Sequence, residues 1–512
     1  MTHATSVPNT LLGLLSAAPA DRIAIVQPEL NVRLTYGALR HQVETVASAL
    51  AAAGVRRGDR VGMALPNGIP NIVVFLAASV AGTAAPLNPA YKEDEFRFYL
   101  DDTNAKVLLL PPEGMDEARR AAGNTVPIVT VDMDAEGTVG LAGVPAGQPV
   151  TTPGVDEIAL VLHTSGSTGR PKRVPLSHAN LSISAANVAR SYALTQDDVS
   201  VCVMPLFHVH GLVASTLATL LTGGTVVVPG KFSPLSFWRI AQEVGATWYS
   251  AVPTIHQLLL ARVTPGTPKP AGAAKIRFIR SCSASLPPQV MHDLEAAFGA
   301  PVLEAYGMTE AAHQMSSNPL PPAPHLPGSV GLGTDVGITI RDGEGRPLPS
   351  GARGEVCIKG PNVITGYENN PEANLTAFFE GGWFRTGDQG TLDEHGYLSL
   401  TGRLKEMINR GGEKISPREI DEVLLAHPAV AEAVCFGVAH PTWGEEVAAA
   451  VQLREPVTEA DLLAFCKERL ADFKRPKTIH ITDAIPRTAT GKIQRRVVAQ
   501  AYAEQTSAEQ TS

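Results

Sequence analysis

The sequence predicts a protein of mixed class, α/β with α+β, that has a large N-terminal domain and a small C-terminal domain. Helical and strand patterns alternate through most of the chain, and repeated βα units of this kind form parallel sheets covered by helices. The pattern changes to short strands near residue 330 and changes again near residue 403. A length of 512 residues accommodates three or four structural units at about 100–200 residues each.

The first elements show this alternation. Residues 35–53 carry apolar side chains at helical spacing, and Thr35 is a candidate N-cap for the helix. Residues 59–67 predict a short strand, residues 71–80 a second helix, and residues 82–90 a strand that a proline ends. The order of strand, helix and strand favours a parallel sheet.

Two later segments are predicted to be irregular connections between helices and strands. Residues 133–156 are rich in Gly, Pro and Thr, which predicts a surface connection. Residues 317–329, SNPLPPAPHLPGS, contain too many prolines for regular structure. The short strands with glycine-containing turns that follow predict a β-rich subdomain over about 330–402.

The changes in pattern divide the chain into two domains. Residues 1–403 form the large domain, and residues 404–512 are enough for one small α+β domain. The polar tail 503–512 repeats EQTS, so we expect it to be disordered.

Composition and charge exclude several classes of protein. Asp+Glu 50 exceed Lys+Arg 42, and the net charge of −8 argues against a nucleic-acid partner. The cysteines, 5 in all, are scattered without CxxC spacing, which favours reduced thiols over a metal or redox site. The apolar run 72–87 is interrupted by Gly82 and Pro86, so we expect no membrane insertion. There is no signal-peptide pattern and no peroxisomal Ser-Lys-Leu address, so a cytoplasmic location is expected.

The strongest local signal is the loop TSGSTGRPK, residues 164–172, directly after the apolar strand 158–163. Glycines allow backbone N–H groups to approach an anion, hydroxyls add donors, and Lys172 adds charge. The loop is not a Walker A motif, because Pro171 precedes the lysine and no Ser or Thr follows it. On composition alone, a flexible surface turn remains the alternative.

This loop resembles the phosphate loop of the ATP-dependent adenylate-forming superfamily, which includes the acyl-CoA synthetases. Other hallmarks of that superfamily follow in the right order and cover most of the chain: YGMTE at 306–310, WFRTGD at 383–388, TGRLKE at 401–406 with NRGGEKI at 409–415, and PRTATGKI at 486–493.

The resemblance implies that a carboxylate attacks the α-phosphate of ATP, pyrophosphate leaves, and the acyl group then passes to coenzyme A. It assigns ATP and coenzyme A as co-substrates and Mg²⁺ as the metal, bound by Glu310. Catalytic roles are expected for Lys492, Thr309 and His208. The nucleotide-binding residues implied are Thr164, Ser165, Gly166, Ser167, Thr168, Gly169, Lys172, Ser283, Glu304, Ala305, Tyr306, Asp388 and Arg403.

In this superfamily the small C-terminal domain is mobile. Lys405 matches the hinge about which it rotates after adenylation. One orientation presents the Lys492 loop to the phosphates. The other presents Gly411 and Gly412, which would line the tunnel for the coenzyme A thiol.

The expected acid-binding pocket departs from the pattern usual for apolar acids. Polar side chains rim it, and Ala305 replaces the usual glycine before Tyr306. The candidate substrate-binding residues, which share hydrogen-bonding side chains, are Arg280, Ser283, Ser285, His210 and His313, together with His208. Such groups favour a substrate with a second carboxylate. A further departure is Arg173, where glycine is common.

The segments RSCSASLPP at 280–288, PLFHVHGL at 205–212 and HQMSSNPLP at 313–321 together resemble the oxalate–CoA ligase branch, so oxalate is the expected acid. One alternative is a CoA ligase for another small acid, such as malonate, or for an aryl acid. The other is a stand-alone adenylation enzyme that loads a carrier protein. Intact Lys492, Glu310 and Asp388 argue against a non-enzymatic nucleotide-binding protein. The sequence leaves the oligomeric state open between a monomer and a homodimer.

Overall fold

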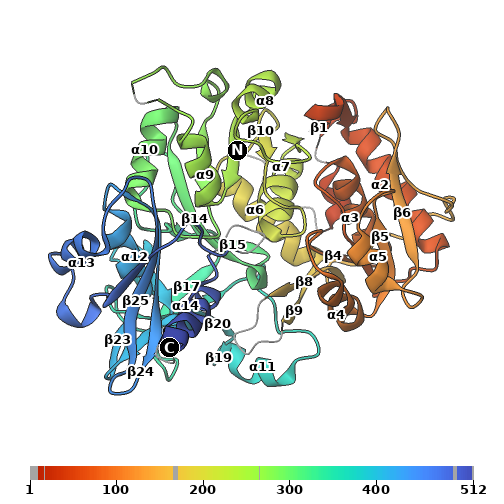
Figure 1. The fold of residues 1–512 in the computed structure, drawn as a ribbon. Coiled ribbons are helices and arrows are strands. Elements are labelled where there is room, and N and C mark those ends of the chain that lie inside the picture. The colour runs from red at the N-terminus through yellow and green to blue at the C-terminus, as the bar shows by residue number, and fades with distance from the viewer. Residues whose placement is uncertain (1–9, 17, 165–170, 265, 488–492, 510–512) are drawn as a thin grey trace.

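The computed structural model describes residues 10–16, 18–164, 171–264, 266–487 and 493–509. It confirms the predicted class: a large N-terminal domain of helix-covered sheets and a smaller C-terminal α+β domain, which is the blue part of Figure 1.

The first large sheet has strand order β7-β6-β5-β3-β4-β8-β9. Its central strands are parallel, and antiparallel strands close both edges. The bounds are β3 (Arg60–Met63), β4 (Thr83–Pro86), β5 (Ala105–Leu110), β6 (Ile128–Met133), β7 (Val139–Leu141), β8 (Ile158–Thr164) and β9 (Lys172–Ser177). The short strand β7 lies within the predicted connection 133–156, so that segment is not wholly irregular.

The second large sheet has strand order β16-β15-β14-β13-β12-β10-β11-β1-β2. The six strands from β14 to β1 run parallel, so their carboxyl ends meet at one edge. The bounds are β1 (Ile23–Gln27), β2 (Val32–Thr35), β10 (Val199–Cys202), β11 (Thr225–Val227), β12 (Trp248–Ala251), β13 (Phe278–Ser281), β14 (Val302–Met308), β15 (His313–Ser317) and β16 (Leu332–Gly333).

Helices α2 (Tyr36–Ala52), α3 (Ile69–Ala81) and α6 (His178–Ser191) share one apolar core with strands of both large sheets. Thr35 caps α2 as predicted, because its side chain accepts from Ala38 N. The remaining helices of the large domain are α1 (Leu11–Leu14), α4 (Glu93–Thr103), α5 (Asp116–Ala122), α7 (Ala218–Leu221), α8 (Phe237–Val244), α9 (Pro253–Leu260), α10 (Pro288–Phe298) and α11 (Pro371–Ala377).

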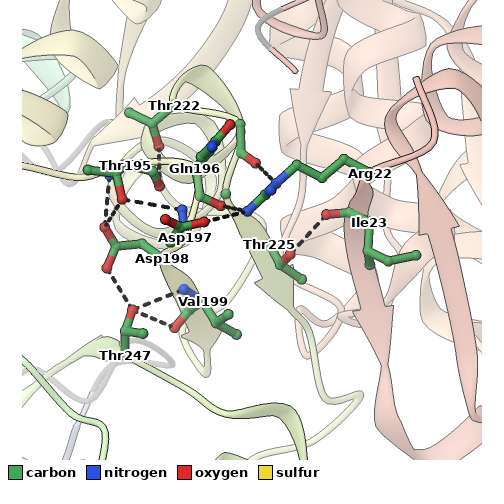
Figure 2. Close-up of polar contacts among 12 residues, drawn as sticks. Arg22, Ile23, Thr195, Gln196, Asp197, Asp198, Val199, Thr222, Thr225 and Thr247 are labelled. Atoms are coloured by element: carbon green, nitrogen blue, oxygen red, sulfur yellow. Dashed lines mark hydrogen bonds and ion pairs between the residues drawn. The ribbon is translucent and has the colours of Figure 1, made fainter. Parts of the chain in front are cut away.

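Hydrogen bonds between distant segments hold the β1–β11–β10 end of the second sheet together (Figure 2). The guanidinium of Arg22 donates to the carbonyl of Gln196, and the Thr225 hydroxyl donates to the carbonyl of the first β1 residue at 2.9 Å. Asp198, which is buried, accepts from the Thr247 hydroxyl at 2.7 Å. These contacts tie β1 to β11 and to the segment before β10, and they tie that segment to Thr247, the residue before β12.

The β-rich subdomain is an antiparallel sheet of order β17-β18-β20-β19, with β21 paired to β20. Its strands are β17 (Gly337–Arg341), β18 (Gly354–Lys359), β19 (Phe378–Phe379), β20 (Trp383–Leu392) and β21 (Leu398–Arg403). The proline-rich residues 318–329, all described, contain no helix or strand. Both findings agree with the sequence pattern.

The C-terminal domain has its own five-stranded sheet and apolar core. Its elements are η5 (Leu404–Glu406), β22 (Ile408–Arg410), β23 (Glu413–Ile415), α12 (Pro417–Leu425), β24 (Val430–His440), β25 (Gly444–Leu453), α13 (Glu459–Lys467), β26 (Thr478–Ile481) and α14 (Arg495–Glu509).

The prediction of a disordered tail from residue 503 was wrong as far as Glu509, because α14 continues to that residue. The segment is rich in Ala, Glu and Gln, which are good helix formers, and an existing helix extends at little cost. All 5 cysteines are free and buried. No helix in the described part of the chain combines the length and apolarity that a membrane span requires.

Candidate active site

A buried polar cluster lies beside the carboxyl ends of the central strands of the second sheet, and Arg280 of β13 is at its centre. The Arg280 side chain is fully buried. Its guanidinium donates to Tyr192 Oη at 2.9 Å, Ser250 Oγ at 2.9 Å and Gln314 Oε1 at 3.0 Å. All three acceptors are neutral, and none of the ion pairs found among the described residues includes Arg280. An arginine stays charged in proteins, so this positive charge is buried without a counter-charge among the residues that the structure describes.

His210 bridges Arg280 to the loop after β13. It begins a buried π-helical segment, η2 (His210–Leu217), a type of helix often found at functional sites. Its Nε2 lies 2.6 Å from Ser250 Oγ and 3.4 Å from an Arg280 nitrogen, and its Nδ1 lies 3.0 Å from Ser283 Oγ. Because the guanidinium can only donate, Nε2 accepts and Nδ1 carries the proton. Ser283 Oγ then accepts from His210, which leaves the hydroxyl hydrogen of Ser283 available to a ligand.

Burial and the neighbouring charges fix the protonation state of His210. Burial and His313, with Arg280 close by, hold the pKa of His210 well below its ordinary value. His210 is therefore neutral at pH 7.

His313 is the first residue of β15, and its backbone is strained. Ala312 and His313 have φ of 51° and 125°, which are unusual for residues with side chains. The His313 ring packs edge-on against His210 at 5.1 Å, and its Nδ1 lies 3.4 Å from an Arg280 nitrogen. Because the guanidinium of Arg280 can only donate, Nδ1 of His313 accepts, and the ring proton is on Nε2. A Cβ on Gly307 would lie 2.2 Å from the His313 carbonyl oxygen, so only glycine allows β14 and β15 to approach here.

The structure therefore brings Arg280, Ser283, His210 and His313 together, as the sequence predicted. His208 is half-buried nearby, and its Nδ1 accepts from His210 N at 3.2 Å. Ser285 is exposed and joins none of the side-chain hydrogen bonds found among the described residues of this cluster.

A second group of side chains joins β14 to the β-rich sheet. The Tyr306 hydroxyl donates to Asp388 of β20, and Arg403 of β21 pairs with the same carboxylate at 3.1 Å. Tyr306 and Asp388 are buried, whereas the side chain of Arg403 is 60% exposed. Burial raises the pKa of the Tyr306 hydroxyl well above its ordinary value, so it remains a donor.

Glu304 and Ala305 precede Tyr306 and are buried. Glu304 accepts from Leu286 N at 2.9 Å, and its other carboxylate oxygen has no hydrogen-bond partner among the described residues. Burial raises the pKa of Glu304 to about 7, so a large fraction of this side chain is neutral near physiological pH.

Glu310 is a buried carboxylate surrounded by hydroxyls. It lies in η4 (Thr309–Ala311), next to buried Thr309. Its Oε1 accepts from Tyr367 Oη at 2.9 Å and is 3.4 Å from Thr164 Oγ1. Burial raises the pKa of Glu310, and no ion pair found among the described residues includes it. Mg²⁺ is usually held by one or two carboxylates together with substrate phosphates, and this arrangement fits such an ion.

Tyr367 was not singled out in the sequence. The GY pair at 366–367 was available as a signal, but only the folded structure places its hydroxyl on Glu310.

The base of the phosphate loop is close to the hinge. Thr164 and Lys172 are opposite each other in the β8–β9 pair. Burial lowers the pKa of Lys172, and Lys405 of η5 lowers it further. Residues Ser165 to Gly169 and catalytic candidate Lys492 lie outside the described residues.

The predicted tunnel loop has the backbone of a tight turn. Gly411 and Gly412 have φ of 59° and 95°, and a Cβ on Gly411 would lie 2.8 Å from the Trp443 ring. A larger residue at 411 would be strained and would press on that ring.

Comparison with known proteins identifies the family of this chain. The family model of the AMP-binding enzyme matches residues 15–368, and that of the AMP-binding enzyme C-terminal domain matches residues 419–492. An oxalate–CoA ligase of Arabidopsis thaliana is 49% identical, over 97% of this chain and 99% of that protein. An oxalate–CoA ligase of Saccharomyces cerevisiae is 43% identical over 98% of both chains. A sulfoacetate–CoA ligase of Cupriavidus necator is 38% identical over 95% and 97%.

Solved structures show the same architecture. ATP-bound MatB from Rhodopseudomonas palustris is 31% identical and superposes with a TM-score of 0.89, over 97% of this chain and 99% of that one. Apo MatB from the same organism superposes with a TM-score of 0.78 over the same shares of the two chains. The chain therefore belongs to the family of AMP-binding enzymes, and within it to the acyl–CoA ligases.

Proposed function

We propose that the protein is an oxalate–CoA ligase. A carboxylate oxygen of oxalate attacks the α-phosphorus of ATP, the bond to the bridging oxygen breaks, and pyrophosphate leaves. The thiolate sulfur of coenzyme A then attacks the carbonyl carbon of oxalyl-AMP, AMP leaves, and oxalyl-CoA is formed. The thiol proton passes to solvent.

The single observation that carries the choice of acid is the buried guanidinium of Arg280, whose described partners are all neutral. Oxalate has a second carboxylate one bond from the reacting one, and this charge needs a counter-charge inside the closed pocket. Arg280 supplies the positive charge, while the hydroxyl of Ser283 and the Nε2–H of His313 supply donors. A fatty acid would bury an alkyl chain against these polar groups and leave their hydrogen bonds unmade.

The relatives support the same choice. The Arabidopsis and yeast relatives are both named for oxalate, and the Cupriavidus relative is named for sulfoacetate. Sulfoacetate also has a second acidic group close to its carboxylate. A pocket with one unneutralised arginine suits this class of small dianionic acid.

For the nucleotide, we assign the ribose hydroxyls to Asp388 and Arg403 and the base to Tyr306 and the backbone of 304–305. Thr309 and the 164–172 loop bind the phosphates. Glu310 holds Mg²⁺, which neutralises charge on the phosphates when it is bound. The partly neutral Glu304 avoids placing a full negative charge beside the base.

The second half-reaction requires the C-terminal domain to rotate about Lys405. The structure superposes on ATP-bound MatB with a TM-score of 0.89 and on apo MatB with 0.78, so its overall shape is more similar to the ATP-bound protein. After rotation, Gly411 and Gly412 would border the path of the thiol.

Replacing His313 with alanine tests the acid pocket. We expect the KM for oxalate to rise, or turnover to fall, by about tenfold or more, the scale of about 1.4–3 kcal/mol for one hydrogen bond to a charged group. ATP binding should be unchanged, because the nucleotide-binding groups are elsewhere. The measurement is ATP–pyrophosphate exchange at varied oxalate.

His178→Ala is the matched control. The His178 ring is equally buried, but it is 3.0 Å from the Ser79 carbonyl and accepts from Leu11 N at 3.2 Å, in the N-terminal core. It should lower the melting temperature and leave the KM for oxalate unchanged. If His313→Ala used oxalate as well as the parent protein, the dicarboxylate pocket would have to be abandoned.

A further inference from the structure

The departure from the family pattern at Arg173 belongs to a network that joins the phosphate loop to the Glu310 segment. Two consecutive residues of β9 contact two consecutive residues of the chain before α11. Lys172 Nζ lies 4.5 Å above the Tyr367 ring, and Arg173 pairs with Glu368 at 3.6 Å. The Glu368 N–H also donates to the Arg173 carbonyl at 3.1 Å.

Further ion pairs hold this junction in place. Arg60, at the start of β3, pairs with the other oxygen of Glu368. Arg173 pairs with Asp102 of α4 at 3.2 Å, and His163 is 3.0 Å from the same carboxylate oxygen. His163 and Arg173 are opposite each other in the β8–β9 pair, so Asp102 binds both arms of the hairpin that carries the phosphate loop. The side chains in these pairs are at most 22% exposed, so solvent screens them little.

We propose that Tyr367 is a positioning residue that sets the metal-binding carboxylate of Glu310 and the phosphate-binding ammonium of Lys172 relative to each other. Its hydroxyl holds Glu310, and the face of its ring holds Lys172. Glu368, fixed between Arg60 and Arg173, keeps Tyr367 in register with β9. This inference rests on the proposed function, because it takes Glu310 and Lys172 as the groups that bind Mg²⁺ and phosphate.

Two substitutions separate the two contacts. Tyr367→Phe removes only the hydroxyl, so the Glu310 contact is lost and the ring over Lys172 stays. Tyr367→Leu removes both. Calorimetric titration of the full chain with ATP, in excess Mg²⁺ and again in EDTA, reports binding without turnover.

For Tyr367→Phe we expect ATP affinity to fall about tenfold in Mg²⁺ and to be unchanged in EDTA, the scale of one hydrogen bond to a charged group. For Tyr367→Leu we expect affinity to fall in both conditions. Glu368→Gln removes the charge that Arg60 and Arg173 bind, and it should weaken binding in both conditions by at least about threefold, because a pair that solvent screens little contributes more than an exposed one.

Tyr397→Phe is the matched control. Tyr397 and Tyr367 are each 9% exposed, and the Tyr397 hydroxyl donates to the Pro324 carbonyl at 2.7 Å, so the same atom and one hydrogen bond are removed. Tyr397→Phe should leave the affinity for ATP unchanged both in Mg²⁺ and in EDTA.

The failure of this inference is distinguishable from the failure of the proposed function. If Glu310→Gln removes the Mg²⁺ dependence of ATP binding while Tyr367→Phe leaves it intact, the positioning role is wrong and the metal assignment stands. If Glu310→Gln also leaves it intact, the metal assignment fails, and the positioning role fails with it. Equal losses in Mg²⁺ and EDTA for Tyr367→Phe would likewise overturn the separate hydroxyl contact.

Discussion

Replacing Lys492 with alanine should lower the rate of ATP–pyrophosphate exchange by at least about 10²–10³-fold, the effect of removing one preorganised donor from a developing charge. We assign the ammonium of Lys492 to the space between the attacking carboxylate and the α-phosphate, where both reactants are anionic. Thioester formation from supplied oxalyl-AMP should be largely spared, because the rotation that we propose for the C-terminal domain would move Lys492 away from the adenylate before that step.

The control is Arg496→Ala, which removes an exposed cation four residues along the chain and should leave both half-reactions intact. Equal losses in the two half-reactions of Lys492→Ala would contradict the rotation of the C-terminal domain.

Replacing Arg280 with methionine should lower kcat/KM for oxalate by about 10²–10⁴-fold. Without the guanidinium, the second carboxylate of oxalate would be buried with no counter-charge, at a cost of about 3–5 kcal/mol. The same change should leave the melting temperature of the free protein unchanged or raise it. It removes a buried charge whose hydrogen-bond partners among the described residues are all neutral. Steady-state kinetics and thermal unfolding measure the two effects.

Arg280→Lys is the matched variant, because it keeps the charge and loses the fork of donors. It should retain more oxalate activity than Arg280→Met. A loss of stability in Arg280→Met that matched its loss of activity would mean that Arg280 serves the fold and not the substrate.

The sequence was sufficient for the elements whose signals are local. The N-cap at Thr35, the strand before the phosphate loop and the antiparallel strands after residue 330 are all present. The tail beyond residue 503 was misjudged, because its polar composition concealed a continuation of α14.

The site was predictable only in part, because its contacts join residues that are far apart in the sequence. Arg280, His210 and His313 could be named from motif positions, but their partners could not. Tyr192 and Gln314 are 122 residues apart, and only the order of strands and helices brings their oxygen atoms to one guanidinium. Ser285 looked equivalent to Ser283, yet the positive φ of 73° at Ser283 takes the backbone out of its extended course, and Ser285 ends exposed.

The most direct test of the central claim is ATP–pyrophosphate exchange by the purified protein with a panel of acids: oxalate, malonate, sulfoacetate, benzoate, butyrate and octanoate. Thioester formation with coenzyme A should then be measured for each acid that exchanges. We expect the highest kcat/KM with oxalate, followed by the other small dianions, and efficient formation of oxalyl-CoA. A preference for octanoate or benzoate would contradict the pocket that we assign around Arg280, His210 and His313.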